Sequence, residues 1–433
     1  MTDSTTNPVS TQTISAQLET TVVVSWKVVI AYTVFTVLSA VLLFGFPQDG
    51  DVTYKLTPSD EAFQLAPLVV SATTVSLIAI VLLVLATVAA IVLTRARRKV
   101  PLWLTVVVAF VVFSGFLTWA AAGSSTPSVP LPGLLAGGLS LSVPLIFGAM
   151  AGVIGERSGV VNIAIEGQML GGAFTSAMVA TLTGNPWLGL IAAMAAGVLV
   201  AALLAVFAIR YWVDQVIVGV VLNVLVIGLT NFLFSEVLAD NAATLNAPPR
   251  FDRIDIPLLG DIPIIGPMFF RQTIIVYIMY VTVAAVAFAL YKTRWGLRTR
   301  AIGEHPQAAD TVGIRVNRMR FINVLIAGAI AGLGGAFFTL GAVGAFNKEM
   351  TAGAGYIALA AVIFGQWDPI KATLAALLFG FASNIQNTLG VMGSPVPSEF
   401  MLMLPYLVTI FAVAGLVGRS RPPAADGIPY KKA

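Results

Sequence analysis

Long apolar stretches recur along the chain at spacings that predict a series of membrane-crossing helices. A helix that crosses the hydrocarbon core of a bilayer needs about 20 mainly apolar residues. Twelve segments meet or approach that length: 24–46, 67–94, 102–122, 134–154, 160–182, 187–209, 213–235, 273–291, 321–343, 353–366, 371–391 and 399–417. The segment 353–366 is short, so we expect it to be re-entrant or broken and to lie against protein. The pattern predicts an all-α, polytopic integral membrane protein with about 12 transmembrane helices.

The character of these segments changes near residue 134. Between 24 and 122 they consist almost wholly of Val, Leu, Ala and Ile, whereas the later segments are rich in Gly, Asn, Gln and Pro. We interpret 24–122 as three added N-terminal helices and 134–417 as a functional core of about nine. Residues 1–23 are rich in Ser and Thr and are predicted to be disordered, and 418–433 form a polar tail.

Charge supports the membrane assignment and gives its orientation. Charged residues make up 10% of the chain, against roughly 25% in soluble domains, so lipid must be the solvent for most of the protein. With the N-terminus inside, 18 basic residues fall in cytoplasmic segments and five in outer ones, as the positive-inside bias requires. We expect both termini in the cytoplasm, a long cytoplasmic loop at 292–320, and an outer loop at 236–272 whose five prolines prevent a long helix.

Several kinds of chemistry are excluded by what the sequence lacks. There is no cysteine and one histidine, His305, so thiolate chemistry is impossible and a histidine-based metal site or catalytic triad is implausible. No G-x-x-x-x-G-K-[ST] sequence occurs, so the chain has no phosphate-binding loop of its own. We therefore expect no catalytic residue, no metal and no cofactor bound by this chain.

The cytoplasmic stretch RTRAIGEHPQAADTVGIRVNRMR (298–320) contains a short helix with recognisable ends. Pro306 suits the first helical turn, and Gly313 suits the left-handed position just beyond the C-terminus. Ala308, Ala309 and Val312 are spaced by three and four residues, which places them on one face. A helix of two turns is unstable alone in water and needs a partner surface. Two interpretations fit this segment: a docking helix for a cytosolic protein, or a basic loop that rests on anionic lipid headgroups.

A second group of polar residues, GERSGVVNIAIEGQMLGGAF (155–174), begins at a cytoplasmic end and enters the membrane. Asn162 and Glu166 are four apart and are predicted to share a helical face. An ionisable group in the membrane is costly and indicates a function or a buried partner. Glu166 is either a structural hydrogen-bonding group between helices or part of a gate. We favour the structural role with a protonated side chain, because burial without a counter-charge disfavours the ionised form.

Neutral amides occur on later predicted spans, and each alone more often joins helices than contacts a ligand. No lysine or arginine is predicted near the middle of the membrane, so the expected cargo is neutral, with several hydrogen-bonding groups. Gly328 and Gly332 form a G-x-x-x-G pair, which predicts close helix packing. The predicted substrate path comprises Asn162, Glu166, Asn223, Asn231, Asn384 and Asn387.

At these residues the chain resembles the permease subunits of ABC importers that serve ribose-like sugars, branched-chain amino acids and nucleosides. The motifs are most similar to those of the nucleoside and simple-sugar branch. The resemblance covers 134–417 in order, with the matching pieces GERSGVVNIAIEGQMLGGAF, AIGEHPQAADTVGI, MTAGAGYIALAAVIFGQWDPI, PSEFMLMLPYLVTIF and GRSRPPAADGIPY.

The resemblance implies a type II-like ABC permease core in the bacterial cell (inner, cytoplasmic) membrane. It also implies partners: a cytosolic ABC ATPase that holds ATP and Mg²⁺, a second homologous permease, and an extracytoplasmic substrate-binding lipoprotein, with no nucleic acid. The segment 304–313 would be the coupling helix to the ATPase, through Glu304, His305, Pro306, Ala308, Ala309, Asp310 and Gly313.

The expected function is import of a neutral polar solute, foremost nucleosides, by alternating access. A ribose-like sugar or branched-chain amino acid permease is the alternative within the family. An ion-coupled secondary transporter is more remote, because it would be expected to show a relay of intramembrane charged residues. An enzyme acting on lipid-soluble substrates is disfavoured by the scarcity of paired carboxylates, histidines and thiols.

Overall fold

The structure is a computed structural model that describes residues 26–58, 64–397, 399–400, 403 and 421–432. Nine helices in this part of the chain are long and apolar enough to cross a membrane, which confirms the predicted class of helical, polytopic membrane protein. The predicted disordered segment 1–23 lies outside the described residues, as does nearly all of the predicted last span, 399–417. The total of 12 helices therefore stays a prediction.

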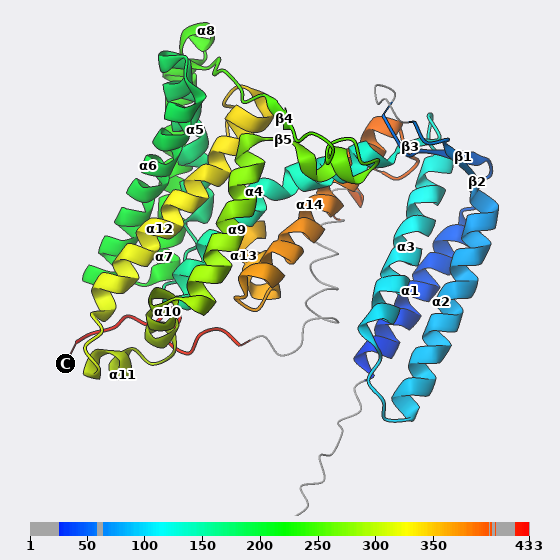
Figure 1. Ribbon diagram of the computed structural model, residues 1–433, viewed down its shortest axis with the longest axis horizontal. Coiled ribbons are helices and arrows are strands. Elements are labelled where there is room, and N and C mark those ends of the chain that lie inside the picture. Colours follow the sequence, from blue (N-terminus) through cyan, green and yellow to red (C-terminus); the bar gives the residue numbers. More distant parts are fainter. Residues whose placement is uncertain (1–25, 59–63, 398, 401–402, 404–420, 433) are drawn as a thin grey trace, which may run out of the picture.

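The N-terminal unit consists of three long helices with a small sheet at one end (Figure 1): α1 (Lys27–Gly45), α2 (Ala72–Arg95) and α3 (Leu102–Ala122). Hydroxyl groups tie the helices together, with Tyr32 bonded to Thr105 at 2.7 Å and Thr36 to Thr87 at 3.0 Å. Apolar side chains on the outer surfaces of α1 and α2 are largely exposed, as expected of helices that face lipid.

The small sheet was not predicted from the hydrophobic pattern. Its strands are β1 (Asp51–Lys55), β2 (Leu68–Ser71) and β3 (Ser128–Pro130), with β1 in the centre, antiparallel to β2 and parallel to β3. Because β3 leads directly into the first core helix, the sheet links the N-terminal unit to the core. Further contacts join α3 and the loop that follows it to the core: the Phe113 and Phe381 rings lie 5.3 Å apart, and the Ser125 hydroxyl donates to the Met392 carbonyl at 3.0 Å.

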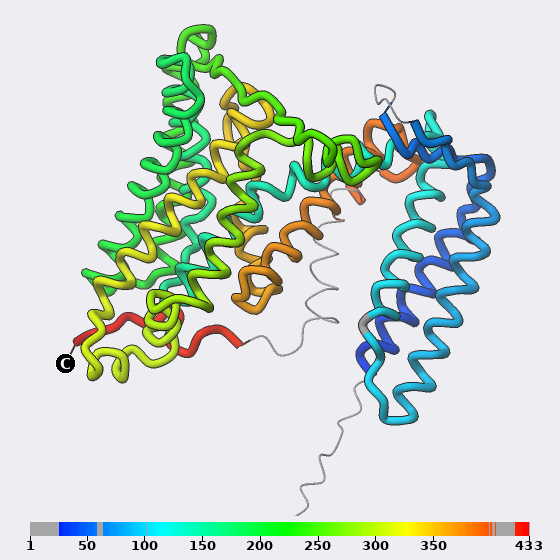
Figure 2. The backbone as a smooth tube through the Cα atoms, in the orientation of Figure 1, coloured from blue at the N-terminus to red at the C-terminus, as the bar shows by residue number. Residues whose placement is uncertain are grey.

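The core is a larger helical body (Figures 1 and 2). Several of its long helices end in a π-helical turn. Its long elements are α4 (Leu131–Arg157), α5 (Ile165–Thr183), α6 (Pro186–Ala205) with η1 (Val206–Arg210), α7 (Gln215–Leu233) with η2 (Phe234–Leu238), α9 (Ile274–Lys292), α12 (Val316–Ala336) with η4 (Phe337–Val343), and α14 (Pro369–Met392).

The segment 353–366 forms the short helix α13 (Ala354–Phe364). Its 11 residues extend about 16 Å, roughly half of the hydrocarbon thickness, which confirms that this segment is too short for a full crossing. It packs against α4, α5 and α14, so its backbone ends meet protein rather than lipid.

Two loops depart from regular helix. Residues 158–164 form a turn, so α5 begins at Ile165 rather than near 160. The predicted outer loop 236–272 has no long helix, as expected. It carries α8 (Ala242–Leu245), η3 (Gly266–Phe270) and the antiparallel strands β4 (Arg253–Asp255) and β5 (Arg271–Thr273).

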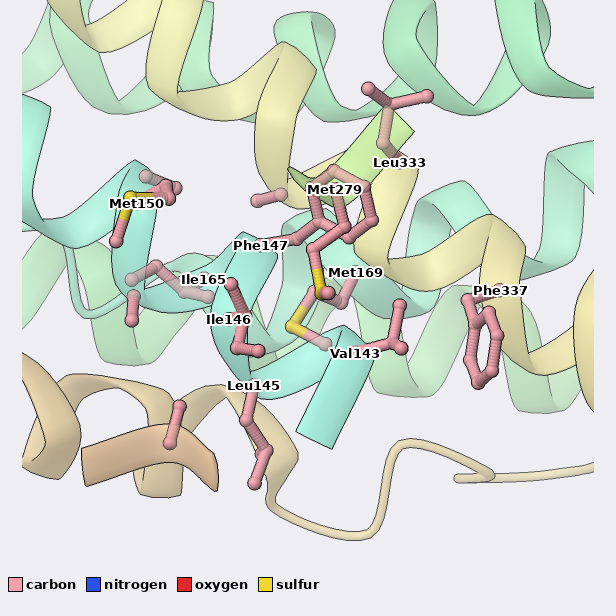
Figure 3. Packing of buried hydrophobic residues seen from close by; sticks show 14 of the residues in the cluster. Val143, Leu145, Ile146, Phe147, Met150, Ile165, Met169, Met279, Leu333 and Phe337 are labelled. Carbon is pink, nitrogen blue, oxygen red and sulfur yellow. The ribbon is translucent and has the colours of Figure 1, made fainter. Parts of the chain in front are cut away.

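Helix α4 lies at the centre of the core. Its side chains Val143, Phe147 and Met150 are fully buried, and Figure 3 shows Phe147 close to Met169 of α5 within the same apolar cluster. Large and flexible apolar side chains fill the space between these helices, as in the interiors of soluble proteins.

Helices α6 and α12 contact one another directly through their backbones. A Cβ atom added at Gly197 or Gly328 would overlap the carbonyl group of the other residue, and one added at Gly332 would overlap the Ala193 carbonyl. The predicted close packing of the G-x-x-x-G pair is therefore confirmed, and α6 is the partner helix.

Candidate functional site

Glu166 is buried in the core of the helical body and binds the start of the short helix α13. Its Oε1 accepts hydrogen bonds from the Thr351 hydroxyl at 2.6 Å and the Gly353 amide at 2.9 Å, and its Oε2 accepts one from the Gly355 amide at 2.7 Å. The first amides of a helix have no partner within the helix, and its N-terminus favours negative charge. Glu166 therefore supplies α13 with the acceptors that water would otherwise provide.

The three hydrogen bonds to the Glu166 carboxyl are all donated to it, by one hydroxyl and two backbone amides, which suits the predicted structural role. In one respect the geometry differs from the sequence prediction. Asn162 does not share a helical face with Glu166, because it lies in the turn before α5. Asn162 instead forms a reciprocal amide pair with Gln168, at 3.0 and 3.1 Å.

Asn223 joins three segments at the same level of the core. Its Oδ1 accepts from the Gly167 amide at 2.8 Å, and its Nδ2 donates to the Ile163 carbonyl at 2.9 Å and the Tyr356 hydroxyl at 3.0 Å. The side chain is fully buried. Asn162, Glu166 and Asn223 therefore lie around the start of α5, where their polar atoms hold protein groups in this conformation.

The other predicted path residues lie elsewhere. Asn231 donates to Glu349 at 2.9 Å, and Asn384 donates to the Leu134 carbonyl at 2.7 Å, which ties α14 to α4. Asn387 is exposed on α14. The six residues thus do not form one continuous lining within this chain.

Three residues that bond to Glu166, Asn223 or Asn162 were not predicted to do so: Thr351, Tyr356 and Gln168. The spacing of Gly353 and Gly355 before an apolar run was the available signal, since it marks a helix start whose amides need acceptors. Nothing in the sequence indicated that Glu166, nearly 190 positions earlier, would provide them.

On the predicted cytoplasmic side, the loop between α9 and α12 contains two helices, α10 (Arg294–Glu304) and α11 (Pro306–Thr311). The predicted ends of the short helix are confirmed: Pro306 opens α11, and Gly313 has a positive φ of 86°. The prediction that Ala308, Ala309 and Val312 share one face is wrong. Ala309 is buried within the chain, whereas Ala308 and Val312 are exposed, together with Glu304 and His305. Asp310 is half-buried.

The C-terminal tail, residues 421–432, runs beside α10 and α11 (Figure 1, red). The Ala425 amide donates to the Gly303 carbonyl at 2.8 Å, and the Arg320 guanidinium donates to the Ile428 carbonyl at 2.8 Å. Tyr430 packs with Ile302, Ala309 and Val316 in one small apolar cluster. The tail is therefore an integral part of the surface that carries α11.

A buried charge cluster lies beneath the tail. Arg320 is 1% exposed, and Gly159 leaves room for its guanidinium, because a Cβ there would overlap the Arg320 side chain. Burial raises the pKa of Asp426 in the tail to about 7, although the Gly427 amide and the Arg320 charge act to lower it. Glu156, at the end of α4, lies close enough to Asp426 to interact electrostatically and accepts a hydrogen bond from the Trp367 indole.

Comparison with known proteins places this architecture in a family. Residues 134–413 match the family described as "Branched-chain amino acid transport system / permease component". The match begins after the N-terminal unit, which lies outside it. Within the matched region are α5, α13, α10 and α11, whereas the tail residues 421–432 lie beyond it.

Named relatives agree with this match. The chain is 44% identical to the guanosine ABC transporter permease protein NupQ of Bacillus subtilis (strain 168), over 68% of this chain and 95% of that protein. It is 38% identical to the nucleoside ABC transporter permease protein NupC of Lactococcus lactis subsp. cremoris, over 69% and 96%. It is 36% identical to the putative glucose ABC transporter permease protein TsgC13 of Haloferax volcanii, over 59% and 77%. The chain therefore belongs to the branched-chain amino acid transport system permease family, and is a multi-pass ABC transporter permease of the bacterial cell membrane.

Proposed function

We propose that this chain is the pore subunit of an ATP-driven importer that carries nucleosides into the cytoplasm by alternating access. The observation that carries the proposal is the 44% identity to a guanosine permease over nearly its whole length. The polar groups around the start of α5 are consistent with an uncharged cargo, because Asn162 and Asn223 are neutral amides whose hydrogen bonds go to other neutral groups. The likeness to a glucose permease supports a sugar as the second candidate.

The partners of such an importer follow from its mode of energy coupling. A separate cytosolic ATPase binds ATP and Mg²⁺, closes on nucleotide binding, and acts on the coupling helix α11. A second, homologous permease completes the pore, and a substrate-binding lipoprotein delivers the nucleoside to outer loops such as 236–272. The exposed side chains of Glu304, His305 and Ala308 support the coupling role, since they are accessible to a cytosolic protein.

An ion-coupled secondary transporter is the competing function. It would use an intramembrane ionisable group that exchanges ions or protons. Glu166 is already engaged by one hydroxyl and two backbone amides at α13, which supports a fixed structural role over a relay.

Uptake by a strain that lacks this permease tests the cargo class. We expect loss of radiolabelled guanosine and uridine uptake, restored by the wild-type chain, with unchanged uptake of the corresponding monophosphates. The phosphates are the control, because they add negative charge to an otherwise similar molecule. Unchanged nucleoside uptake, with loss of ribose, glucose or leucine uptake, would move the chain to a sister branch.

Reconstitution with the partner subunits in proteoliposomes tests the energy source. Accumulation should require ATP and continue when a protonophore collapses the ion gradient. Accumulation that the protonophore abolishes while ATP is present would favour the secondary transporter.

A further inference from the structure

The coupling helix α11 forms one wall of a groove whose other wall is the C-terminal tail. The groove has a volume of about 470 Å³. Glu304, His305 and Gln307 line it on the α11 side, and Ile428, Tyr430 and Lys431 line it on the tail side. Segments more than 110 positions apart in the sequence therefore present one continuous surface.

The tail is held to the body of the protein mainly through its backbone, so side chains on its outer surface stay exposed to solvent. Backbone bonds fix it at Ala425 and Ile428, and the Lys431 ammonium lies 4.7 Å from the centre of the Trp212 ring, before α7. The Ile428 side chain is nonetheless 56% exposed. The exposed apolar side chain thus sits on a backbone whose position is set by Arg320 of α12.

The size of α11 argues that it does not form a docking site alone. It has six residues, and two of them, Pro306 and Ala309, are buried within the chain. A specific protein interface buries about 800 Å² on each partner, from some 20–30 residues. A neighbouring surface must contribute, and the tail is the one that shares the groove with α11.

Charge favours a protein partner with an acidic or polar contact surface. Lys431 lines the groove. The Lys432 ammonium lies 3.8 Å from a carboxylate oxygen of Asp310, and the Lys432 side chain is 73% exposed. Arg315 and Arg318 are exposed in the segment that follows α11. Complementary charge steers association and fixes the register of the two surfaces.

We propose that the cytosolic ATPase subunit binds both walls of this groove, so that tail residues 424–431 belong to the coupling interface. Its movement then reaches α12 by two routes, through α11 and through the tail backbone bonded to Arg320. This inference rests on the proposed function and assigns the tail a role in it.

Site-specific photocrosslinking in the assembled transporter tests the contact. A photoreactive amino acid at Ile428 should crosslink to the ATPase. The matched control position is Arg98, which is exposed on the predicted cytoplasmic side between α2 and α3 and should give no such product. Equal crosslinking at both positions, or none at Ile428, would overturn the tail contact.

Substitutions test whether the contact matters. Ile428→Asp should lower the ATPase that copurifies with the permease at least tenfold and reduce uptake, while the amount of permease in the membrane stays normal. The hydrogen bond from Arg320 to the Ile428 carbonyl does not depend on the Ile428 side chain. Ala308→Asp probes the α11 wall, and Arg98→Asp is the control. ATPase loss with Ala308→Asp but full retention with Ile428→Asp would refute the two-walled site. A wild-type complex without any ATPase or nucleoside uptake would instead refute the proposed function itself.

Discussion

Replacement of Glu166 by glutamine should loosen the short helix α13. A carboxylate accepts hydrogen bonds on both oxygens, and Glu166 uses both, for three donors. An amide accepts on one atom only. In the better of its two orientations, glutamine keeps the Thr351 and Gly353 bonds and turns its NH₂ group toward the Gly355 amide.

The cost follows from that single changed contact. The Gly355 amide is left buried without an acceptor, which costs about 1–3 kcal/mol. We therefore expect α13 docking to lose about 1–3 kcal/mol. The opening equilibrium of α13 should then rise roughly 5- to 150-fold, at about 1.4 kcal/mol per factor of ten.

The absence of cysteine from the natural sequence makes opening measurable. A cysteine at Ala354, the 8%-exposed first residue of α13, should react with a maleimide reagent at a rate that follows the opened fraction. The control is Glu349→Gln in the same loop, whose exposed carboxylate accepts from Asn231 at 2.9 Å. An amide oxygen can replace that acceptor, so we expect a change within about 0.5 kcal/mol.

Equal labelling rates for Glu166→Gln and Glu349→Gln would refute the anchoring role. Lost transport with normal yield and an unchanged labelling rate would instead assign Glu166 a direct part in gating. Faster labelling accompanied by lower thermal stability is the outcome that the geometry predicts.

Two further predictions concern the helix seam and the tail. Gly328→Val should abolish accumulation of folded protein, because its branched side chain would overlap the Gly197 carbonyl and the Ala201 Cβ. The control is Gly228→Val, where a Cβ meets open space. Equal yields of the two variants by detergent size-exclusion chromatography would contradict this prediction. The raised pKa of Asp426, about 7 against about 4 for an ordinary aspartate, means that the docked tail binds a proton more tightly than the released tail, so docking should weaken as pH rises from about 4 to 7. Tryptic cleavage in the tail, expressed as the ratio of wild type to Asp426→Asn, should increase over that range, and a flat ratio would contradict the assignment.

The membrane-spanning architecture was predictable because it depends on local properties. Apolar length identified the helices, and the shortness of 353–366 identified a segment that cannot cross. The ends of α11 were likewise set by Pro306 and Gly313, whose backbone preferences act without distant partners.

The contacts that organise the core were not predictable in the same way. The periodicity that placed Asn162 and Glu166 on one face assumed a continuous helix, and the turn at 158–164 broke that assumption. The pairing of Glu166 with Gly353 and Gly355, and of Arg320 with the tail, joins residues separated by over 100 positions. Such pairings depend on how whole helices pack, and a single sequence carries no local signal for them.

The half-length of α13 has a consequence for how the protein is made. An 11-residue apolar helix cannot be inserted across a bilayer as an independent unit, because its terminal backbone groups would remain in hydrocarbon without partners. Its acceptor, Glu166, is synthesised nearly 190 residues earlier, so the site that receives α13 precedes it during translation. Biogenesis of this region should therefore be sequential, with α5 in the bilayer before α13 can settle, and a defect at Glu166 should appear first in newly made chains as late-stage assembly failure.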